Sequence, residues 1–245
     1  MDVQDPVYSL SLGGIPLALK LRYPDTAQYF RRFLSAGGGD IKGTVSVPDR
    51  AFADWASAGN AMDAFGEFCL FCQSVSEALM EQGGCVFHAA ALRFRDRAVL
   101  LAGGSGAGKS THLRKLLEGH PAEFLVINGD KPVLRFSEEG VTVHPSPWNG
   151  KEGLRGAEAA PLAAIYFLNR TDKDEVEPCP PRKAGAFVFP MVFQSYFDED
   201  VIRKAAAAAE KIVTAAPCFI FHTRDIDRSS ALLYRSIEEV TRHGL

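Results

Sequence analysis

A glycine-rich segment has the residue types that bind phosphate groups. It reads LAGGSGAGKST over residues 101–111, so the pattern Gly-x-x-x-x-Gly-Lys-Ser runs from Gly103 to Ser110. Glycine has no Cβ atom, so the chain takes left-handed turns and approaches a ligand closely, and the N–H groups of such a loop make a concave anion site. In this pattern Lys109 reaches the β- and γ-phosphates and the Ser110 hydroxyl ligates Mg²⁺.

The residues on either side of this loop favour a strand before it and a helix after it. RAVLLA at 97–102 is short and apolar, and STHLRKLLEG at 110–119 has leucines at helical spacing. A helix that begins at the loop adds partial positive charge beneath bound phosphates, which favours a nucleotide site over a plain glycine-rich turn. The predicted nucleotide-binding residues here are Gly104, Ser105, Gly106, Ala107, Gly108, Lys109, Ser110 and Thr111.

An acidic residue follows the next apolar segment. FLVINGD places Asp130 directly after a predicted buried strand, 21 positions beyond Lys109. Phosphate oxygens repel an incoming nucleophile, and Mg²⁺ neutralises that charge. We therefore predict that Asp130 holds Mg²⁺ together with Ser110, directly or through water. The alternative is an ordinary turn aspartate, since Asn-Gly-Asp is rich in turn formers.

A histidine precedes the loop. His88 lies inside CVFHAAALRF at 85–94, which we expect to be a strand. If this strand pairs with 97–102, His88 falls near the same sheet edge as the loop. A histidine there orients a phosphate, ligates a metal or shuttles a proton; a packed histidine with a satisfied ring is the alternative.

These segments together resemble a known superfamily. FHAAALRFRDRAVLLAGGSGAGKST at 87–111, followed by VINGD at 126–130, resembles the kinase core of HPr kinase/phosphorylase and the nucleotide half of ATP-dependent phosphoenolpyruvate carboxykinase. The resemblance covers roughly residues 85–240. It implies an α/β core with a P-loop and a mixed sheet, ATP and Mg²⁺ as cofactors, His88 near the γ-phosphate and Asp130 on the metal. It also allows a homo-oligomer.

One position departs from that pattern. HPr kinases commonly have two adjacent acids where this sequence has Gly129 before Asp130, and the first acid is thought to act as base on the acceptor hydroxyl. Its absence leaves two interpretations. One is a kinase that moves the γ-phosphoryl group to a hydroxyl of a small molecule or of a peptide or protein serine. The other is a non-catalytic ATP-binding sensor or assembly module.

Other candidate residues lie further along the chain. HPSPWNGKEGLRG at 144–156 offers Lys151 and Arg155 to a phosphate and Trp148 to a ring, unless it is a surface loop anchored by a buried tryptophan. Arg170 ends an apolar strand, where a cation stabilises charge on the transferring group or is merely solvated. The aromatic-rich segment 189–197 either covers the acceptor pocket or packs in the core.

Composition limits the function classes. The 245 residues carry a net charge of −3, so no global field recruits nucleic acid or an anionic membrane. No apolar run approaches the roughly 20 residues of a membrane span, and the acidic start MDVQDPVYSL differs from a signal peptide. These features predict a cytoplasmic protein. Cys69 and Cys72 lack a second ligand pair for zinc, so we interpret the five cysteines as reduced thiols.

The predicted elements divide the chain into two parts. Residues 1–82 are expected to form a small β-rich region, with a hairpin over 7–23 that turns at Gly13-Gly14 and a closing helix over 61–82. Residues 83–245 alternate strands and helices, which favours an α/β nucleotide-binding core. Several adjacent strands there have connections too short for crossovers, so the sheet is expected to be mixed.

Overall fold

The computed structural model describes residues 7–35, 41–150, 153–154, 156, 158–195 and 198–243. The chain begins with an antiparallel hairpin of β1 (Val7–Leu12) and β2 (Ile15–Lys20). Gly13 and Gly14 form the turn with φ of +57° and +76°, which glycine adopts without steric cost. The predicted hairpin is confirmed. A third strand of only two residues, β3 (Thr44–Val45), pairs with β2.

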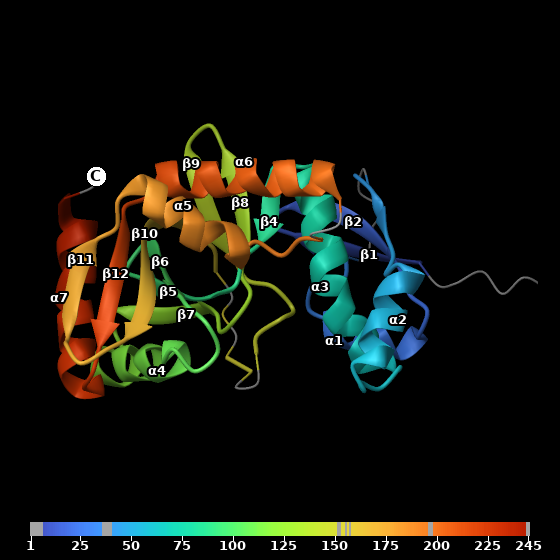
Figure 1. Ribbon diagram of the computed structural model, residues 1–245. Helices are drawn as coiled ribbons and strands as arrows, with labels where there is room; N and C mark the ends of the chain where they lie inside the picture. The colour runs from blue at the N-terminus through green and yellow to red at the C-terminus, as the bar shows by residue number, and fades with distance from the viewer. Residues whose placement is uncertain are drawn as a thin grey trace, which may run out of the picture.

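Three helices pack with this small sheet at one end of the molecule (Figure 1). They are α1 (Ala27–Phe30), α2 (Asp49–Ser57) and α3 (Ala64–Met80). The Asp63 side chain caps α3 by accepting a hydrogen bond from the Gly66 N–H, and the buried face of α3 completes a core with β1 and β2. The helix expected over 61–82 is confirmed, whereas α2 was not foreseen because Phe52 is its only buried residue.

The rest of the chain forms a nine-stranded mixed sheet. Its order is β4-β8-β9-β10-β6-β5-β7, and β12 pairs with β10 on one side and with β11 on the other. β10 begins antiparallel to β9 and continues parallel to both β6 and β12, so the sheet curls around this long strand. The strands are β4 (Gly84–Val86), β5 (Ala89–Phe94), β6 (Arg97–Ala102), β7 (Phe124–Asn128), β8 (Val133–Ser137), β9 (Gly140–His144), β10 (Ala160–Arg170), β11 (Glu175–Pro178) and β12 (Cys218–Thr223).

Helices cover both faces of this sheet, as Figure 1 shows. On one face α4 and α7 bury Leu113 and Leu233 against the central strands, and on the other α5 and α6 bury Val188 and Ile212. Burial on both faces explains the continuous apolar runs of the central strands. The helices are α4 (Lys109–Gly119), α5 (Pro181–Val188), α6 (Glu199–Ala215) and α7 (Ile226–His243). The mixed α/β architecture expected from sequence is confirmed.

The strand directions gather the candidate residues at one sheet edge. β6, β10 and β12 are parallel, so their carboxyl ends lie together. β5 runs antiparallel to β6 with Ala89 opposite Ala102. His88 precedes Ala89, and the glycine-rich loop follows Ala102, so the two lie side by side. Within the described residues, no helix is long and apolar enough to cross a bilayer.

Candidate functional site

The glycine-rich loop is a tight turn that leads straight into α4. Gly108 occupies the N-cap position with φ of +100°, and Gly106 has φ of +79°. A Cβ atom built on Gly104 or Gly106 would meet nothing within 4 Å, so open space lies over the loop. The Lys109 Nζ donates hydrogen bonds to the carbonyl oxygens of Gly103 at 2.7 Å and Gly104 at 3.3 Å. These two hydrogen bonds hold the ammonium group against the first residues of the loop.

A buried histidine supports the loop from behind. His112 on α4 is fully buried, with Nδ1 3.0 Å from the Ser230 hydroxyl and Nε2 3.2 Å from the Thr223 hydroxyl. Burial lowers the pKa of His112 to about 4, so the ring is neutral at physiological pH. It ties the first turn of α4 to β12 and α7, and thus fixes the helix whose N-terminus faces the loop.

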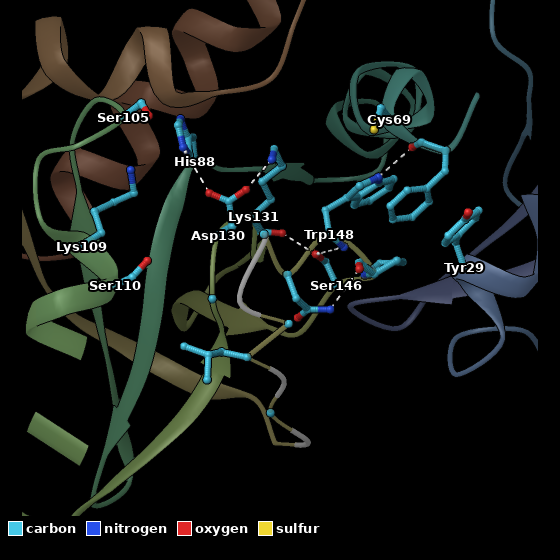
Figure 2. A pocket seen from close by; sticks show the side chains of 18 of the residues that line it. Tyr29, Cys69, His88, Ser105, Lys109, Ser110, Asp130, Lys131, Ser146 and Trp148 are labelled. Carbon is cyan, nitrogen blue, oxygen red and sulfur yellow. Dashed lines mark hydrogen bonds and ion pairs between the residues drawn. The ribbon is translucent and has the colours of Figure 1, made fainter. Parts of the chain in front are cut away.

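A cleft of about 1230 Å³ opens in front of the loop. Figure 2 shows Lys109 and Ser110 on one side of it, Asp130 and His88 in the middle, and Tyr29 on the opposite side. The cleft therefore lies between the large sheet and the N-terminal region, and residues of both line it. Every predicted loop residue from Gly104 to Thr111 lines it, as do His88 and Asp130.

Asp130 is the centre of the charged contacts in the cleft. Its Oδ1 lies 3.3 Å from the His88 Nε2, and its Oδ2 accepts a hydrogen bond from the Lys131 ammonium group. Burial raises the pKa of Asp130, but the hydrogen bonds from His88 and Lys131 outweigh this and bring it to about 2. The carboxylate is therefore charged at any physiological pH, as a metal ligand must be, and is a poor proton acceptor near neutrality.

Asn128 holds the turn that carries Asp130. Its side-chain oxygen accepts hydrogen bonds from the backbone N–H groups of Asp130 at 2.9 Å and Lys131 at 2.7 Å. Its amide group donates to the Ser146 hydroxyl at 3.0 Å and to the Asn149 side chain at 3.1 Å. The Ser146 hydroxyl in turn donates to the Lys131 carbonyl oxygen. The sequence alone assigns no role to Asn128, Lys131 or Ser146, although Asn128 and Ser146 belong to segments named above and Lys131 directly follows one of them.

The segment around Trp148 fastens this turn to the N-terminal core. Trp148 is only 4% exposed, its indole N–H donates to the Phe68 carbonyl oxygen at 2.9 Å, and its ring stacks on Phe68. These contacts favour the interpretation of Trp148 as a buried anchor. The candidate residues Lys151 and Arg155 lie outside the described residues.

Gly129 has no room for a side chain. A Cβ atom there would lie 2.7 Å from the Asn149 carbonyl oxygen and 3.1 Å from the Leu154 carbonyl oxygen. Both are backbone atoms, so relieving these contacts requires the main chain to move. The segment that follows Trp148 thus occupies the space that the Cβ atom of an aspartate or glutamate at position 129 would need.

Replacing Gly129 by alanine is therefore expected to destabilise the fold by about 1–3 kcal/mol through overpacking. Gly119→Ala on α4 is the matched control, because a Cβ atom there meets nothing within 4 Å, and it should be neutral or slightly stabilising. Urea unfolding of both variants measures the difference. Equal stability of the two would mean that the segment at Asn149 yields readily.

Arg170 lies apart from the cleft, whereas the aromatic-rich segment 189–197 contacts His88, which lines it. Arg170 is exposed at the end of β10 and does not line the cleft. In the segment 189–197, the Met191 carbonyl oxygen accepts a hydrogen bond from the His88 N–H at 2.8 Å, and Phe193 packs beside the His88 ring. The described part of this segment thus fixes His88 in place, while residues 196–197 lie outside the described residues.

The cysteines are free thiols, as expected. Burial raises the pKa of Cys69 and of Cys72, which makes both poor nucleophiles. Cys69 lines the cleft, and Cys72 is buried in the core beneath it. No group of three or more histidine, cysteine or acidic side chains able to hold a metal occurs among the described residues.

The fold and the site together define a mixed α/β protein with a glycine-rich loop at the start of a helix and a cleft in front of it. The chain belongs to the family of the SynChlorMet cassette protein ScmC, whose sequence model matches residues 67–221. A search of curated proteins finds no significant match. Among solved structures, the chain is similar to the Hpr(Ser) kinase/phosphatase from Coxiella burnetii, with 10% identity, a TM-score of 0.37, and 65% of this chain and 94% of that chain covered. A score this low leaves the function to be argued from the site.

Proposed function

We propose that the protein is an ATP- and Mg²⁺-dependent kinase with a P-loop core of the HPr kinase type in residues 83–245, acting in the cytoplasm on a hydroxyl-bearing acceptor. The observation that carries this proposal is the convergence in one cleft of the glycine-rich loop, Lys109, Asp130 and His88. Each has the chemistry that one part of a phosphoryl-transfer site requires.

The loop suits the triphosphate of ATP. The space above Gly104 and Gly106 is open, and the first N–H groups of α4 have no partner within the helix. Three phosphate groups fit such a concave row of donors at a helix N-terminus. Burial lowers the pKa of Lys109, and the Asp130 carboxylate opposes that shift. The Lys109 ammonium group already contacts the loop carbonyl groups and would pair with the β- and γ-phosphates.

The residues present also suit magnesium. Mg²⁺ keeps several waters and binds through one or two carboxylates together with substrate phosphates, so the Ser110 hydroxyl and a single ionised Asp130 suffice. A dedicated cage of acidic residues is not required. Bound there, the ion would neutralise charge on the phosphate oxygens.

The acceptor chemistry falls to His88. With Gly129 closed to an acid and the Asp130 pKa near 2, we assign the hydroxyl proton to the imidazole of His88, which lies in the cleft in contact with Asp130. The bond from the acceptor oxygen to the γ-phosphorus forms as the bond to ADP breaks. ADP leaves with the electron pair, and the hydroxyl proton passes to the imidazole of His88. Asp130 orients that ring and stabilises its positive charge.

Asp130→Asn is expected to separate nucleotide binding from metal binding. The amide preserves the size of the side chain but removes the charge that Mg²⁺ needs, so affinity for ATP without metal should stay within about twofold. The gain in affinity that Mg²⁺ gives the unmodified protein should disappear. Titration calorimetry with and without Mg²⁺ measures both quantities. An unchanged Mg²⁺ dependence would refute the role of Asp130.

Release or transfer of labelled phosphate from γ-labelled ATP tests the activity itself. We expect Mg²⁺-dependent turnover that requires Lys109 and His88. Binding of ATP–Mg²⁺ without any release or transfer in the presence of cell-extract metabolites and peptides would instead favour a non-catalytic sensor.

A further inference from the structure

We propose that the wall of the cleft formed by α1 and α3 binds the acceptor, and that the acceptor is an acidic peptide segment with an aromatic side chain next to its hydroxyl-bearing residue. This inference rests on the proposed kinase function. It chooses the peptide from the acceptor classes considered above and assigns its recognition to residues of the N-terminal region.

The cleft has more room than a nucleotide site needs. Ligand pockets typically enclose about 300–1,000 Å³, whereas this cleft measures about 1230 Å³. The loop and α4 form one wall, and residues from α1 and α3 form the opposite wall, with His88 and Asp130 between them (Figure 2). A ligand on the opposite wall therefore faces the end of a triphosphate that extends from the loop.

The opposite wall has an aromatic surface. Phe65 is 54% exposed although it is on the same helix face as buried core residues. Tyr29 contacts the Phe65 ring edge-on at 5.8 Å and stacks on Phe68 at 4.8 Å, and all three rings line the cleft. A preformed group of rings binds another aromatic side chain at little entropic cost.

Two arginines give this wall a positive charge. Arg31 and Arg32 directly follow α1, are exposed and line the cleft, and neither pairs with an acid among the described residues. Of the remaining cations, Lys109 lies at the loop and Lys131 is paired with Asp130. Four cations less one carboxylate give the described lining a formal charge of +3 from lysine, arginine and aspartate, although the whole chain carries −3. Such a local excess attracts anionic ligands.

The open form of this wall favours a peptide over a small metabolite. Small ligands are mostly enclosed when bound, but here the aromatic ring of Phe65 and both arginines remain exposed at the rim. An extended segment makes contact with such a rim and still presents one hydroxyl to the centre. In the proposed reaction its serine oxygen gains the γ-phosphoryl group, ADP leaves, and His88 receives the hydroxyl proton.

Binding of a labelled peptide tests the inference without relying on turnover. The probe is a fluorescein-labelled peptide Asp-Glu-Phe-Ser-Glu-Asp with blocked ends, titrated with the full chain in the presence of a non-hydrolysable ATP analogue and Mg²⁺. We expect the probe to bind at least tenfold more tightly than versions with lysine at the acidic positions or alanine in place of phenylalanine. Arg31→Glu/Arg32→Glu should weaken its binding at least tenfold, because like charges then face each other.

Matched variants identify the wall. Arg50→Glu/Arg235→Glu makes the same change in net charge at two exposed arginines that do not line the cleft, and it should leave peptide binding within twofold. Phe65→Ala should weaken binding several-fold, whereas Leu125→Ala, a comparably exposed residue on β7, should not. Affinity for ATP–Mg²⁺, measured separately, should be unchanged in all four variants.

Each outcome decides the question. Loss of peptide affinity only in the cleft variants supports the inference. Equal binding of the acidic and basic peptides, equal losses in cleft and control variants, or no peptide binding by a protein that does bind ATP–Mg²⁺ would each overturn it. Failure of the protein to bind ATP–Mg²⁺ would refute the kinase function itself, and is detected independently by the nucleotide titration.

Discussion

His88→Gln should lower phosphoryl transfer, or the slow hydrolysis of ATP, by roughly 10²-fold or more, the usual scale for a lost acid–base group. Affinity for ATP–Mg²⁺ should stay within about twofold, because Lys109, Ser110 and Asp130 are unchanged. Glutamine still donates a hydrogen bond to Asp130, so the carboxylate keeps a partner, but it cannot take up a proton. Turnover of γ-labelled ATP across several pH values measures the effect, and the variant should show a different dependence of turnover on pH.

His120→Gln is the matched control for this variant. His120 lies at the end of α4 outside the cleft and stacks on Tyr234, so its loss should not change turnover. Full turnover of His88→Gln with an unshifted pH profile would make His88 a packing residue, held by Met191 and Phe193 for stability alone.

Lys109→Ala should remove most of the stabilisation that ATP–Mg²⁺ gives the fold. At a hundredfold excess over Kd, linkage gives the unmodified protein about 2.7 kcal/mol, or a rise in Tm of roughly 5–10 °C for a chain of this size. The variant should melt as the unliganded protein does, because Lys109 bonds only to loop carbonyl groups among the described residues.

Lys115→Ala controls for the loss of a lysine on the same helix. Lys115 lies further along α4, is half-exposed and pairs with Asp227, so its removal should leave the ATP-dependent shift intact. If Lys109→Ala retained the full shift, the loop would not be the phosphate site.

Much of this architecture is predictable because its signals are local. The hairpin at Gly13-Gly14 needs two residues with positive φ, and the pairing of β5 with β6 follows from a short turn between two apolar runs. That pairing alone places His88 beside the loop. In contrast, α2, α5 and β11 carry few buried residues, so their periodicity is too weak to distinguish them from loops.

The parts of the site that sequence reasoning missed depend on contacts between distant segments. Asn128 acts through Ser146 and Asn149, about twenty positions further on. Lys131 is a different case, because its partner Asp130 is the adjacent residue and the sequence does not show which way the lysine side chain turns. The Asn149 carbonyl oxygen likewise leaves no room for a side chain at Gly129, and nothing in the sequence near Gly129 indicates this contact. No motif connects the segments that form the wall of α1 and α3 with the glycine-rich loop, so the sequence does not place them at the same cleft.

Titration of the unmodified protein with ATP in the presence and absence of Mg²⁺ tests the central claim most directly. One nucleotide per chain should bind, with affinity that rises when Mg²⁺ is added, because the loop supplies the phosphate contacts and Asp130 with Ser110 the metal contacts. Calorimetry that detects no binding of ATP–Mg²⁺ by the folded chain would contradict the nucleotide site and everything built on it.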